Sequence, residues 1–360
     1  MHPSNHPSQP AKTALMSAPT LSVIVPVYNS NADLMRCLDA LVASTCNNFD
    51  VLVVDDGSIE PLEPIVTRHS YRYMRIDGPH GPARARNRGA QKVQGLVLVF
   101  IDADVCVHHD TLDRMGKAFI TDPSLAALVG TYDDAPDHPA FISQYMNLFH
   151  RFVHQRSSGQ ISTFWAGCGA IRRDVFLQFG GFDEHRYQRP SIEDIELGMR
   201  ISVAQHRIIL DDRVQCTHLK HWTFWNMLKT DIFARGIPWV RLLHRFNHVD
   251  NKLNVSRSQR VSVMLVYLTI ASVLLALWFP VHWATVLTLG AFVTILNLDL
   301  YRYFIRTRGT LFTLRAIPMH WLYFMYCGIC VGAGTAMRFV VADHHPVSTG
   351  PSMSVDATGQ

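Results

Sequence analysis

LVLVFIDAD, at residues 96–104, consists of six apolar residues followed by two aspartates that flank an alanine. An apolar run of this length is typical of a strand buried on both faces, as in a parallel sheet. Two earlier runs, Leu21 to Val27 and Val51 to Val54, have the same character. Apolar residues at helical spacing separate the first two runs, and residues 84–93 are compatible with a second helix. This order predicts an open α/β sheet with right-handed crossovers.

Polar residues follow all three runs, and four of them are the aspartates at 55, 56, 102 and 104. Ligands of open α/β sheets bind beyond the carboxyl ends of the strands, where these residues are expected to lie. A single aspartate after a strand is usually a turn former or a helix cap. Four carboxylates at two adjacent strand ends repel one another unless a cation lies among them. The sequence therefore predicts a divalent metal, Mg or Mn, bound together with substrate phosphates.

The successive motifs resemble those of glycosyltransferase family 2. They are LSVIVPVYN at 21–29, VVDDGS at 53–58, GPARARNRG at 81–89 and FIDAD at 100–104, with GCGAIRRDVFLQFGGFDE at 167–184 and IEDIELGMR at 192–200 as acceptor-side motifs. The resemblance extends over roughly residues 20–240, and the order of the motifs is more specific than any one of them. It implies a GT-A fold, which is Rossmann-like, with a mixed but mainly parallel sheet flanked by helices.

The resemblance implies roles for the donor-side residues. Asp56 would accept a hydrogen bond from the nucleotide base, with Tyr28 packed nearby. Asp104, the second aspartate of the DxD motif, would ligate the metal, and Asp102 would contact the ribose or a metal-bound water. The metal would act as a Lewis acid on the leaving nucleoside diphosphate. Three further residues are assigned to the donor site: Pro26, Arg84 and Asn87. A solvated basic face is the alternative interpretation of the arginines.

On the acceptor side, the resemblance implies that Asp194 is the general base of an inverting transfer. Its position near the start of a helical segment also fits a helix-stabilising acid. His218 would complete the metal site, or would be a structural histidine. Trp165, Gly167 and Glu193 are assigned to the sugar or acceptor pocket, with simple packing as the alternative.

Three uncharged runs predict about three transmembrane helices: Val261 to Phe279, Trp283 to Leu298 and Ile317 to Met337. Arginines precede the first run and fill the loop before the third, which places residues 1–260 in the cytoplasm, next to a multi-pass inner membrane domain. Seven cysteines, an odd number without a dense framework, fit a reducing compartment.

The expected organisation has five parts. Residues 1–19 and 341–360 are expected to be disordered, and residues 20–218 to form the GT-A domain. Residues 219–260 mix aromatic and basic side chains, as in an amphipathic helix at a membrane interface, although such a helix can also cover the sheet. Residues 261–340 would form the membrane domain.

The predicted function is transfer of one sugar from a nucleotide-sugar, in the first instance a UDP-sugar, to a lipid-linked or cell-envelope glycan acceptor. The QxxRW motif of processive synthases is absent, because residues 234–239 read ARGIPW. Two alternatives stay open: a synthase of polyprenyl-phosphate sugars, and a catalytically silent scaffold that binds nucleotide or lipid. The net charge of +4 is modest, and no aromatic and basic stretch predicts a nucleic-acid partner.

Overall fold

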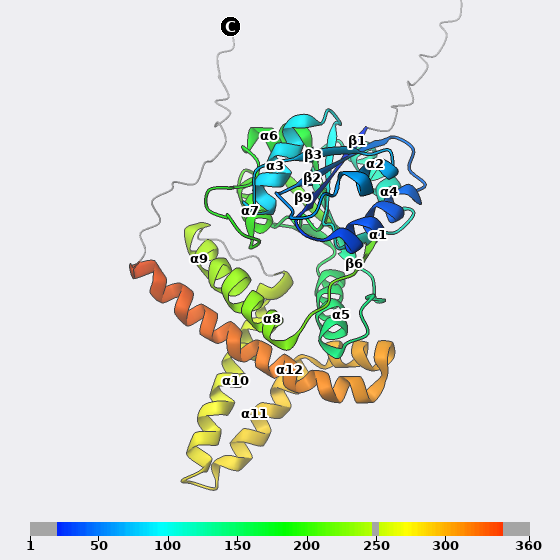
Figure 1. Ribbon diagram of the computed structural model, residues 1–360. Helices are drawn as coiled ribbons and strands as arrows, with labels where there is room; N and C mark the ends of the chain where they lie inside the picture. The colour runs from blue at the N-terminus through cyan, green and yellow to red at the C-terminus, as the bar shows by residue number, and fades with distance from the viewer. Residues whose placement is uncertain (1–19, 247–251, 341–360) are drawn as a thin grey trace, which may run out of the picture.

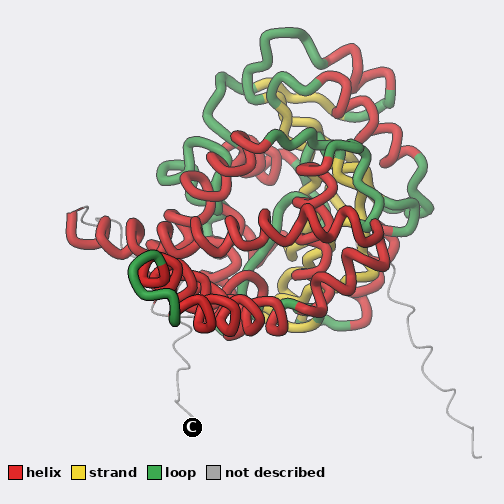
Figure 2. The backbone as a smooth tube through the Cα atoms, turned by 90° about the horizontal axis from the view of Figure 1, so that it is seen from below, coloured by secondary structure: helices red, strands yellow, loops and turns green. Residues whose placement is uncertain are grey.

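The computed structural model describes residues 20–246 and 252–340. The disorder predicted for residues 1–19 and 341–360 concerns residues outside the described part. A sheet with helices on both faces forms one end of the molecule, and a group of longer helices forms the other (Figure 1). Figure 2 looks onto that helical end, where α12 crosses the molecule.

The sheet has the strand order β3-β2-β1-β4-β8-β6-β9-β5, with β7 paired to β9. The first four strands in this order are parallel, whereas β8 is antiparallel to both β4 and β6. This confirms the prediction of a mixed, mainly parallel sheet. The strands are β1 (Leu21–Val27), β2 (Phe49–Asp55), β3 (Arg72–Arg75), β4 (Val97–Ile101), β5 (Val105–Val107), β6 (Leu125–Tyr132), β7 (Gly159–Ile161), β8 (Cys168–Arg172) and β9 (Arg207–His218).

Each inner strand is apolar on both sides because it faces two separate cores. In β1, Val23 and Val25 belong to the core beneath α1, α2 and α4, whereas Ile24 belongs to the core beneath α3, α6 and α7. Alternation of side chains along a strand produces this division. The covering helices are α1 (Asn31–Val42), α2 (Glu63–Arg68), α3 (Pro82–Lys92), α4 (Thr111–Thr121), α6 (Arg173–Gln178) and α7 (Glu193–Val203).

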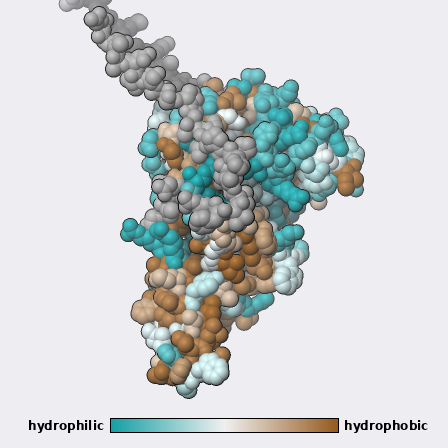
Figure 3. Space-filling model, turned by 90° about the vertical axis from the view of Figure 1, so that its left-hand side faces the viewer, coloured by the Kyte–Doolittle hydropathy of each residue, from teal (hydrophilic) through white to brown (hydrophobic). Residues whose placement is uncertain are grey.

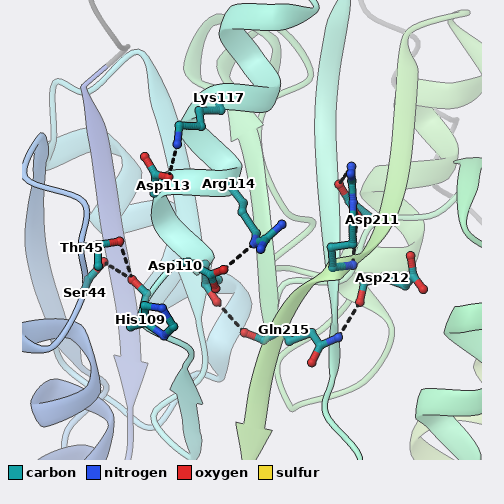
Figure 4. Close-up of polar contacts among 12 residues, drawn as sticks. Ser44, Thr45, His109, Asp110, Asp113, Arg114, Lys117, Asp211, Asp212 and Gln215 are labelled. Atoms are coloured by element: carbon teal, nitrogen blue, oxygen red, sulfur yellow. Dashed lines mark hydrogen bonds and ion pairs between the residues drawn. The ribbon is translucent and has the colours of Figure 1, made fainter.

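A polar network fixes α4 against the sheet (Figure 4). The hydroxyl of Thr111 donates to the carbonyl of Gln215 in β9, and the backbone N–H of Thr45 donates to the carbonyl of His109 at 2.8 Å. Along α4, Arg114 pairs with Asp110 and Lys117 pairs with Asp113 one turn apart. These half-exposed pairs stabilise the helix by a few tenths of a kcal/mol each. The network is structural, and its acidic residues lie away from the main cavity.

The remaining helices connect the sheet to an apolar extension. They are α5 (Phe141–Arg156), α8 (Phe224–Lys229), the π-helical turn η1 (Thr230–Gly236), α9 (Ile237–Phe246), the short 3₁₀ turn η2 (Leu253–Val255), α10 (Arg257–Ala276), α11 (His282–Leu296) and α12 (Leu298–Val340). By length and composition, α10 and α12 could each cross a bilayer, whereas α11 is shorter. The third predicted span lies within α12, which bends at Gly309, where φ is 84°.

Candidate active site

A cavity of about 690 Å³ opens at the carboxyl ends of β1, β2 and β4 and extends to the start of α7. It collects side chains from segments that lie far apart in the sequence. Eight predicted site residues line it: Pro26, Tyr28, Asp56, Asp102, Asp104, Trp165, Glu193 and Asp194. The parallel strands explain the donor-side convergence, because their carboxyl ends meet at one edge of the sheet.

Asp56 lines the cavity and has one carboxylate oxygen without a hydrogen-bond partner. Its Oδ2 accepts hydrogen bonds from the backbone N–H groups of His80, at 2.9 Å, and Gly81, at 2.7 Å. Its Oδ1 is buried and accepts no hydrogen bond. Burial raises the pKa of Asp56, although the two backbone donors oppose that shift. A buried acceptor without a partner is costly, so Oδ1 is suited to a hydrogen-bond donor on a ligand.

The neighbouring Asp55 has a different role. Its carboxylate accepts hydrogen bonds from the backbone N–H of Ser58 at 2.8 Å, the hydroxyl of Tyr73 at 2.7 Å and the guanidinium of Arg75 at 2.9 Å. These contacts fix the turn after β2. Gly57 in that turn has a φ of 82°, a conformation that L side chains rarely adopt. Asp55 therefore holds the loop that presents Asp56.

Asp104 faces His218, the last residue of β9, with 3.6 Å between Oδ2 of Asp104 and Nε2 of His218. The ring of Tyr132 stacks on that of His218 at a centroid distance of 4.3 Å. Burial alone would raise the pKa of Asp104, but the hydrogen bond and charge of His218, with help from Lys220, lower it to about 2. An ionised carboxylate beside an imidazole is a suitable partial ligand set for Mn or Mg. Within the described residues, no group of three or more His, Cys, Asp or Glu side chains is arranged to hold a metal without a ligand.

Arg86 joins the donor side of the cavity to the acceptor side. Its guanidinium donates to Asp102 Oδ1 at 2.6 Å and to Glu193 Oε1 at 2.9 Å. Burial would lower the pKa of Arg86, but the two carboxylates raise it. Two charged partners satisfy a guanidinium that is almost completely buried.

Arg84 and Asn87, which were predicted at the donor site, lie on the same helix, and neither is among the described residues that line the cavity. The amide of Asn87 instead donates to the carbonyl of Phe182 and to Glu184 beside a separate cavity of about 540 Å³. Residues two apart on an α-helix point about 200° away from each other, so Arg86 and its neighbours at 84 and 88 have different surroundings. Arg88 pairs with Glu184 on the other side of the helix, whereas the positive charge of Arg84 still acts to lower the pKa of Asp56.

Asp194 stands at the first turn of α7, where its carboxylate accepts the backbone N–H groups of Ala166 at 2.9 Å and Ile195 at 2.8 Å. Burial, followed by the negative charge of Glu193, raises its pKa to about 7. Such a carboxylate can gain and lose a proton near neutral pH. Close packing fixes the helix, because a Cβ atom at Gly198 would lie 2.0 Å from the backbone nitrogen of Phe164.

Trp165 lines the cavity from the loop that precedes β8. Its ring lies against Tyr132 at 4.8 Å and against His150 and His154 at 5.6 Å each, measured between centroids. Gly167, by contrast, is not one of the described residues that line the cavity. Its carbonyl accepts the N–H of Asp102 at 3.2 Å, and a Cβ at this position would lie 2.6 Å from the Trp165 ring. In this structure Gly167 provides a backbone acceptor and allows close packing of Trp165.

Sequence reasoning missed a group of basic and imidazole side chains that line the cavity. His150 and His154 in α5 each have a buried Nδ1 without a hydrogen-bond partner. Burial lowers the pKa of His154 to about 4 and also lowers that of His150, so both are neutral at pH 7. Lys220 and Arg235 line the same region. The spacing of His150 and His154, four residues apart on one helix face, was the available signal.

Comparison with known proteins finds similarity to the family that the motifs resemble, and to one of its folds. Residues 22–180 match the model of glycosyl transferase family 2. Glycosyltransferase AglE of Haloferax volcanii is 27% identical over 174 residues, which are 46% of this chain and 57% of that protein. An uncharacterized glycosyltransferase of Haemophilus influenzae is 30% identical over 176 residues, 45% of this chain and 55% of that protein. The chain thus spans about half the length of these curated relatives.

Among solved structures, the mannosyltransferase PcManGT from Pyrobaculum calidifontis, in complex with GDP-Man and Mn²⁺, superimposes with a TM-score of 0.51. The alignment covers 90% of this chain and 88% of that chain, with 16% sequence identity. At this identity the likeness establishes the fold alone. It is the GT-A fold that the motifs predicted.

Proposed function

We propose that this protein is an enzyme that transfers a sugar from a nucleotide-sugar to a lipid-linked acceptor, as the match of residues 22–180 to glycosyl transferase family 2 suggests. The observation that carries the proposal is the convergence of Asp56, Asp104 and Asp194 on one cavity. The three carboxylates differ in environment: one has an unpaired oxygen, one faces an imidazole, and one has a pKa near neutrality. Different environments suit them to three different tasks.

The nucleotide would bind at the mouth formed by β1, β2 and β4. Asp56 Oδ1 would accept a hydrogen bond from an N–H of the base, and Tyr28, which is 45% exposed, would cover the base. A uracil or guanine ring offers such an N–H. Asp102, already held by Arg86, would meet the ribose with its free oxygen. This arrangement supports UDP-sugars and GDP-sugars as donors, with UDP-sugars tested first.

A divalent metal, Mg or Mn, would be held by Asp104 and His218, with the donor diphosphate and water as its other ligands. When bound, it would neutralise the charge that develops on the departing nucleoside diphosphate. The donor set supports this assignment, because Mg and Mn are commonly bound by one or two protein ligands together with substrate phosphates. PcManGT was solved with Mn²⁺ and GDP-Man, which is compatible with this assignment.

Asp194 would accept the proton of an acceptor hydroxyl while that oxygen attacks the anomeric carbon. The bond from carbon to acceptor oxygen forms, the bond from carbon to diphosphate oxygen breaks, and the electron pair leaves with the nucleoside diphosphate. Attack from the face opposite the leaving group inverts the configuration at the anomeric carbon. If the acceptor is a polyprenyl phosphate, its oxygen is already ionised, and Asp194 would position the nucleophile without taking a proton.

The acceptor side of the cavity supports a lipid that carries phosphate. Lys220 and Arg235 supply positive charge there, beside the apolar side chains of Trp239 and Leu253. The latter two also line a small adjoining cavity with Lys252, next to the start of α10. The lining therefore continues from the carboxylates toward the apolar helices. A lipid with its phosphate next to Arg235 and its apolar tail beside Trp239 would fit this charged and then apolar lining.

The catalytic domain would work at the cytoplasmic face of the inner membrane, because arginines gather at the bases of the apolar helices. Transfer of a single sugar is proposed, since residues 234–239 lack the QxxRW pattern. A silent scaffold that binds nucleotide or lipid is the competing proposal. Such a scaffold would retain the fold and would not catalyse sugar transfer.

Calorimetric titration of the detergent-solubilised protein with UDP, GDP and their sugar conjugates, with and without Mn²⁺, tests the donor site. We expect one nucleotide to bind in a metal-dependent way, and Asp104→Ala to remove the dependence on metal. Asp113→Ala, a half-exposed carboxylate on α4 outside the cavity, is the matched control. No binding by the wild type under any condition would exclude the transferase proposal. Binding without any sugar transfer to lipid extracts would favour the scaffold.

A further inference from the structure

The α10–α11 hairpin projects beyond the rest of the described chain and is covered by little else (Figure 1, Figure 3). No Asp, Glu, Lys or Arg occurs from Val261 to Leu298. Only 22% of the most apolar window of α10 is buried, so α10 is not the core helix of a soluble protein. Large apolar side chains are exposed along both arms and at the tip: Leu274, Leu275, Trp278, Phe279, Trp283, Leu287 and Phe292. The hairpin has the surface of a membrane-inserted element.

The helix α12 is also apolar, but it behaves differently after its bend at Gly309. From there it runs crosswise to the hairpin, beneath the catalytic domain (Figure 1). Before the bend α12 already contacts α5, where Tyr303 packs on Phe152. After the bend its contacts extend to η1 and α9 and continue to Thr335. Phe312 packs on Phe141 at 5.2 Å between centroids, Tyr326 donates to Asp231 at 2.7 Å, and Thr335 bonds to His244 at 3.0 Å.

Glycines bring α12 into close contact with these neighbours. A Cβ atom at Gly334 would lie 2.7 Å from Cβ of Val240 in α9, and one at Gly236 would lie 2.6 Å from Sγ of Cys330. Such distances leave no space for lipid between α12 and α9. The two helices therefore occupy the same depth relative to a membrane.

The partners of α12 carry charges that a bilayer core excludes. Arg151 lies in α5, Asp231 and Arg235 lie in η1, and Arg241 and Arg245 lie in α9. If α12 crossed the bilayer, these groups would be drawn to bilayer depth, where ionised side chains are strongly unfavourable. The first part of α12 and the residues after its bend carry four arginines, at 302, 306, 308 and 315, which suit anionic headgroups.

On the premise of the proposed membrane location, we infer that the α10–α11 hairpin is the only part of the described chain that enters the bilayer, and that α12 lies along the membrane surface. The interaction surface is the apolar hairpin with the arginine-bearing start of α12 at its base, and its partner is an anionic lipid bilayer. The hairpin leads into the membrane and back. Both ends of the described chain therefore lie on the side of the catalytic domain, whereas three spans would separate them.

Protease protection of the full chain tests this topology. One epitope tag is placed before residue 1 and another after residue 360, and the protein is expressed in a bacterial host. In inside-out membrane vesicles, we expect protease to remove both tags, and in spheroplasts to remove neither. Removal of the two tags from opposite sides would overturn the inference.

Charge substitutions test which helix is inserted. Leu274→Arg with Leu287→Arg, at positions 59% and 73% exposed, should reduce the membrane-bound fraction more than about tenfold. Val42→Arg, at a position 60% exposed on α1, is the matched control and should leave that fraction unchanged. Ile329→Lys at an exposed position of α12 should also stay bound. Retention of the hairpin variant, or release of Ile329→Lys, would contradict the inference. Nucleotide binding in detergent, measured on every variant, tests the proposed catalytic function separately.

Discussion

The guanidinium of Arg86 donates a 2.6 Å hydrogen bond to the carboxylate of Asp102, the first aspartate of the DxD motif. The same guanidinium holds Glu193 at the start of α7. One buried cation thus ties the strand end that would meet the nucleotide to the helix that carries Asp194. Both the stability of the domain and the geometry of the cavity depend on this contact.

Replacement of this cation should therefore be costly. Arg86→Ala removes the cation paired with the buried carboxylate of Glu193 and leaves it only the backbone N–H of Ser191, and loss of a buried ion-pair partner typically destabilises by about 3–5 kcal/mol. For a domain of this size, the melting temperature should fall by roughly 6 °C or more. Differential scanning fluorimetry measures the effect. Arg88→Ala, which removes a half-exposed pair with Glu184 from the same helix, should change the melting temperature by no more than about 2 °C.

The pKa of Asp194 predicts the pH dependence of transfer to a hydroxyl acceptor. A base must be ionised, so below its pKa of about 7 the rate should fall about tenfold per pH unit and above it the rate should level off. Asp194→Asn should lower the rate by at least about 100-fold, whereas Asp113→Asn should not. Initial rates from pH 5 to 9 provide the measurement. A rate that does not change across pH 7 would show that Asp194 takes no proton, as expected for a phosphate acceptor.

Reversal of hydrogen-bonding character at Asp56 should weaken nucleotide binding. In Asp56→Asn, one oxygen still accepts the N–H groups of His80 and Gly81, which places an amide donor where the base would offer its own N–H. Two facing donors should weaken the affinity by roughly 10- to 100-fold. Calorimetry with UDP and GDP measures this loss. Asp77→Asn, on an exposed residue of the neighbouring loop, is the control, and equal losses in both variants would contradict the assignment.

A methyl group at Gly198 should displace the catalytic helix. The new Cβ would meet the backbone of Phe164, which cannot move without disturbing the Trp165 loop. Overpacking of this kind costs about 1–3 kcal/mol, and activity should fall further because Asp194 would leave its contact with Ala166. Gly332→Ala, with nothing within 4 Å of the new atom, should be neutral or slightly stabilising. Thermal melting and initial rates of both variants are the measurements.

The donor half of the fold was predictable from sequence because its strands are continuous apolar runs buried on both faces. The runs at Val51 and Leu96 correspond to β2 and β4, and Asp56, Asp102 and Asp104, which follow them, line the cavity as parallel pairing requires. The strand β8 was not predictable in this way. Its five residues, CGAIR, contain a glycine and end in an arginine, and only tertiary pairing with β4 and β6 makes them a strand.

The site predictions diverged from the structure where they depended on the direction of a side chain. Arg84, Arg86 and Arg88 look equivalent in sequence, and only the orientation of α3 over the sheet separates Arg86 from the others. His150 and His154 belong to a helix that the motifs did not include. The crosswise path of α12 after Gly309 likewise depends on contacts with α5 and α9. The hydropathy of the sequence does not predict such contacts.

The antiparallel pairing of β4 with β8 marks a seam through the molecule. On one side lie the four parallel strands and the residues suited to hold a nucleotide, and on the other lie α5, α7 and the basic rim suited to an acceptor. The match to the family model ends at residue 180, before α7 and Asp194. The match therefore extends across the β4–β8 pairing, and this strand pair is the connection within the sheet between the two sides of the cavity.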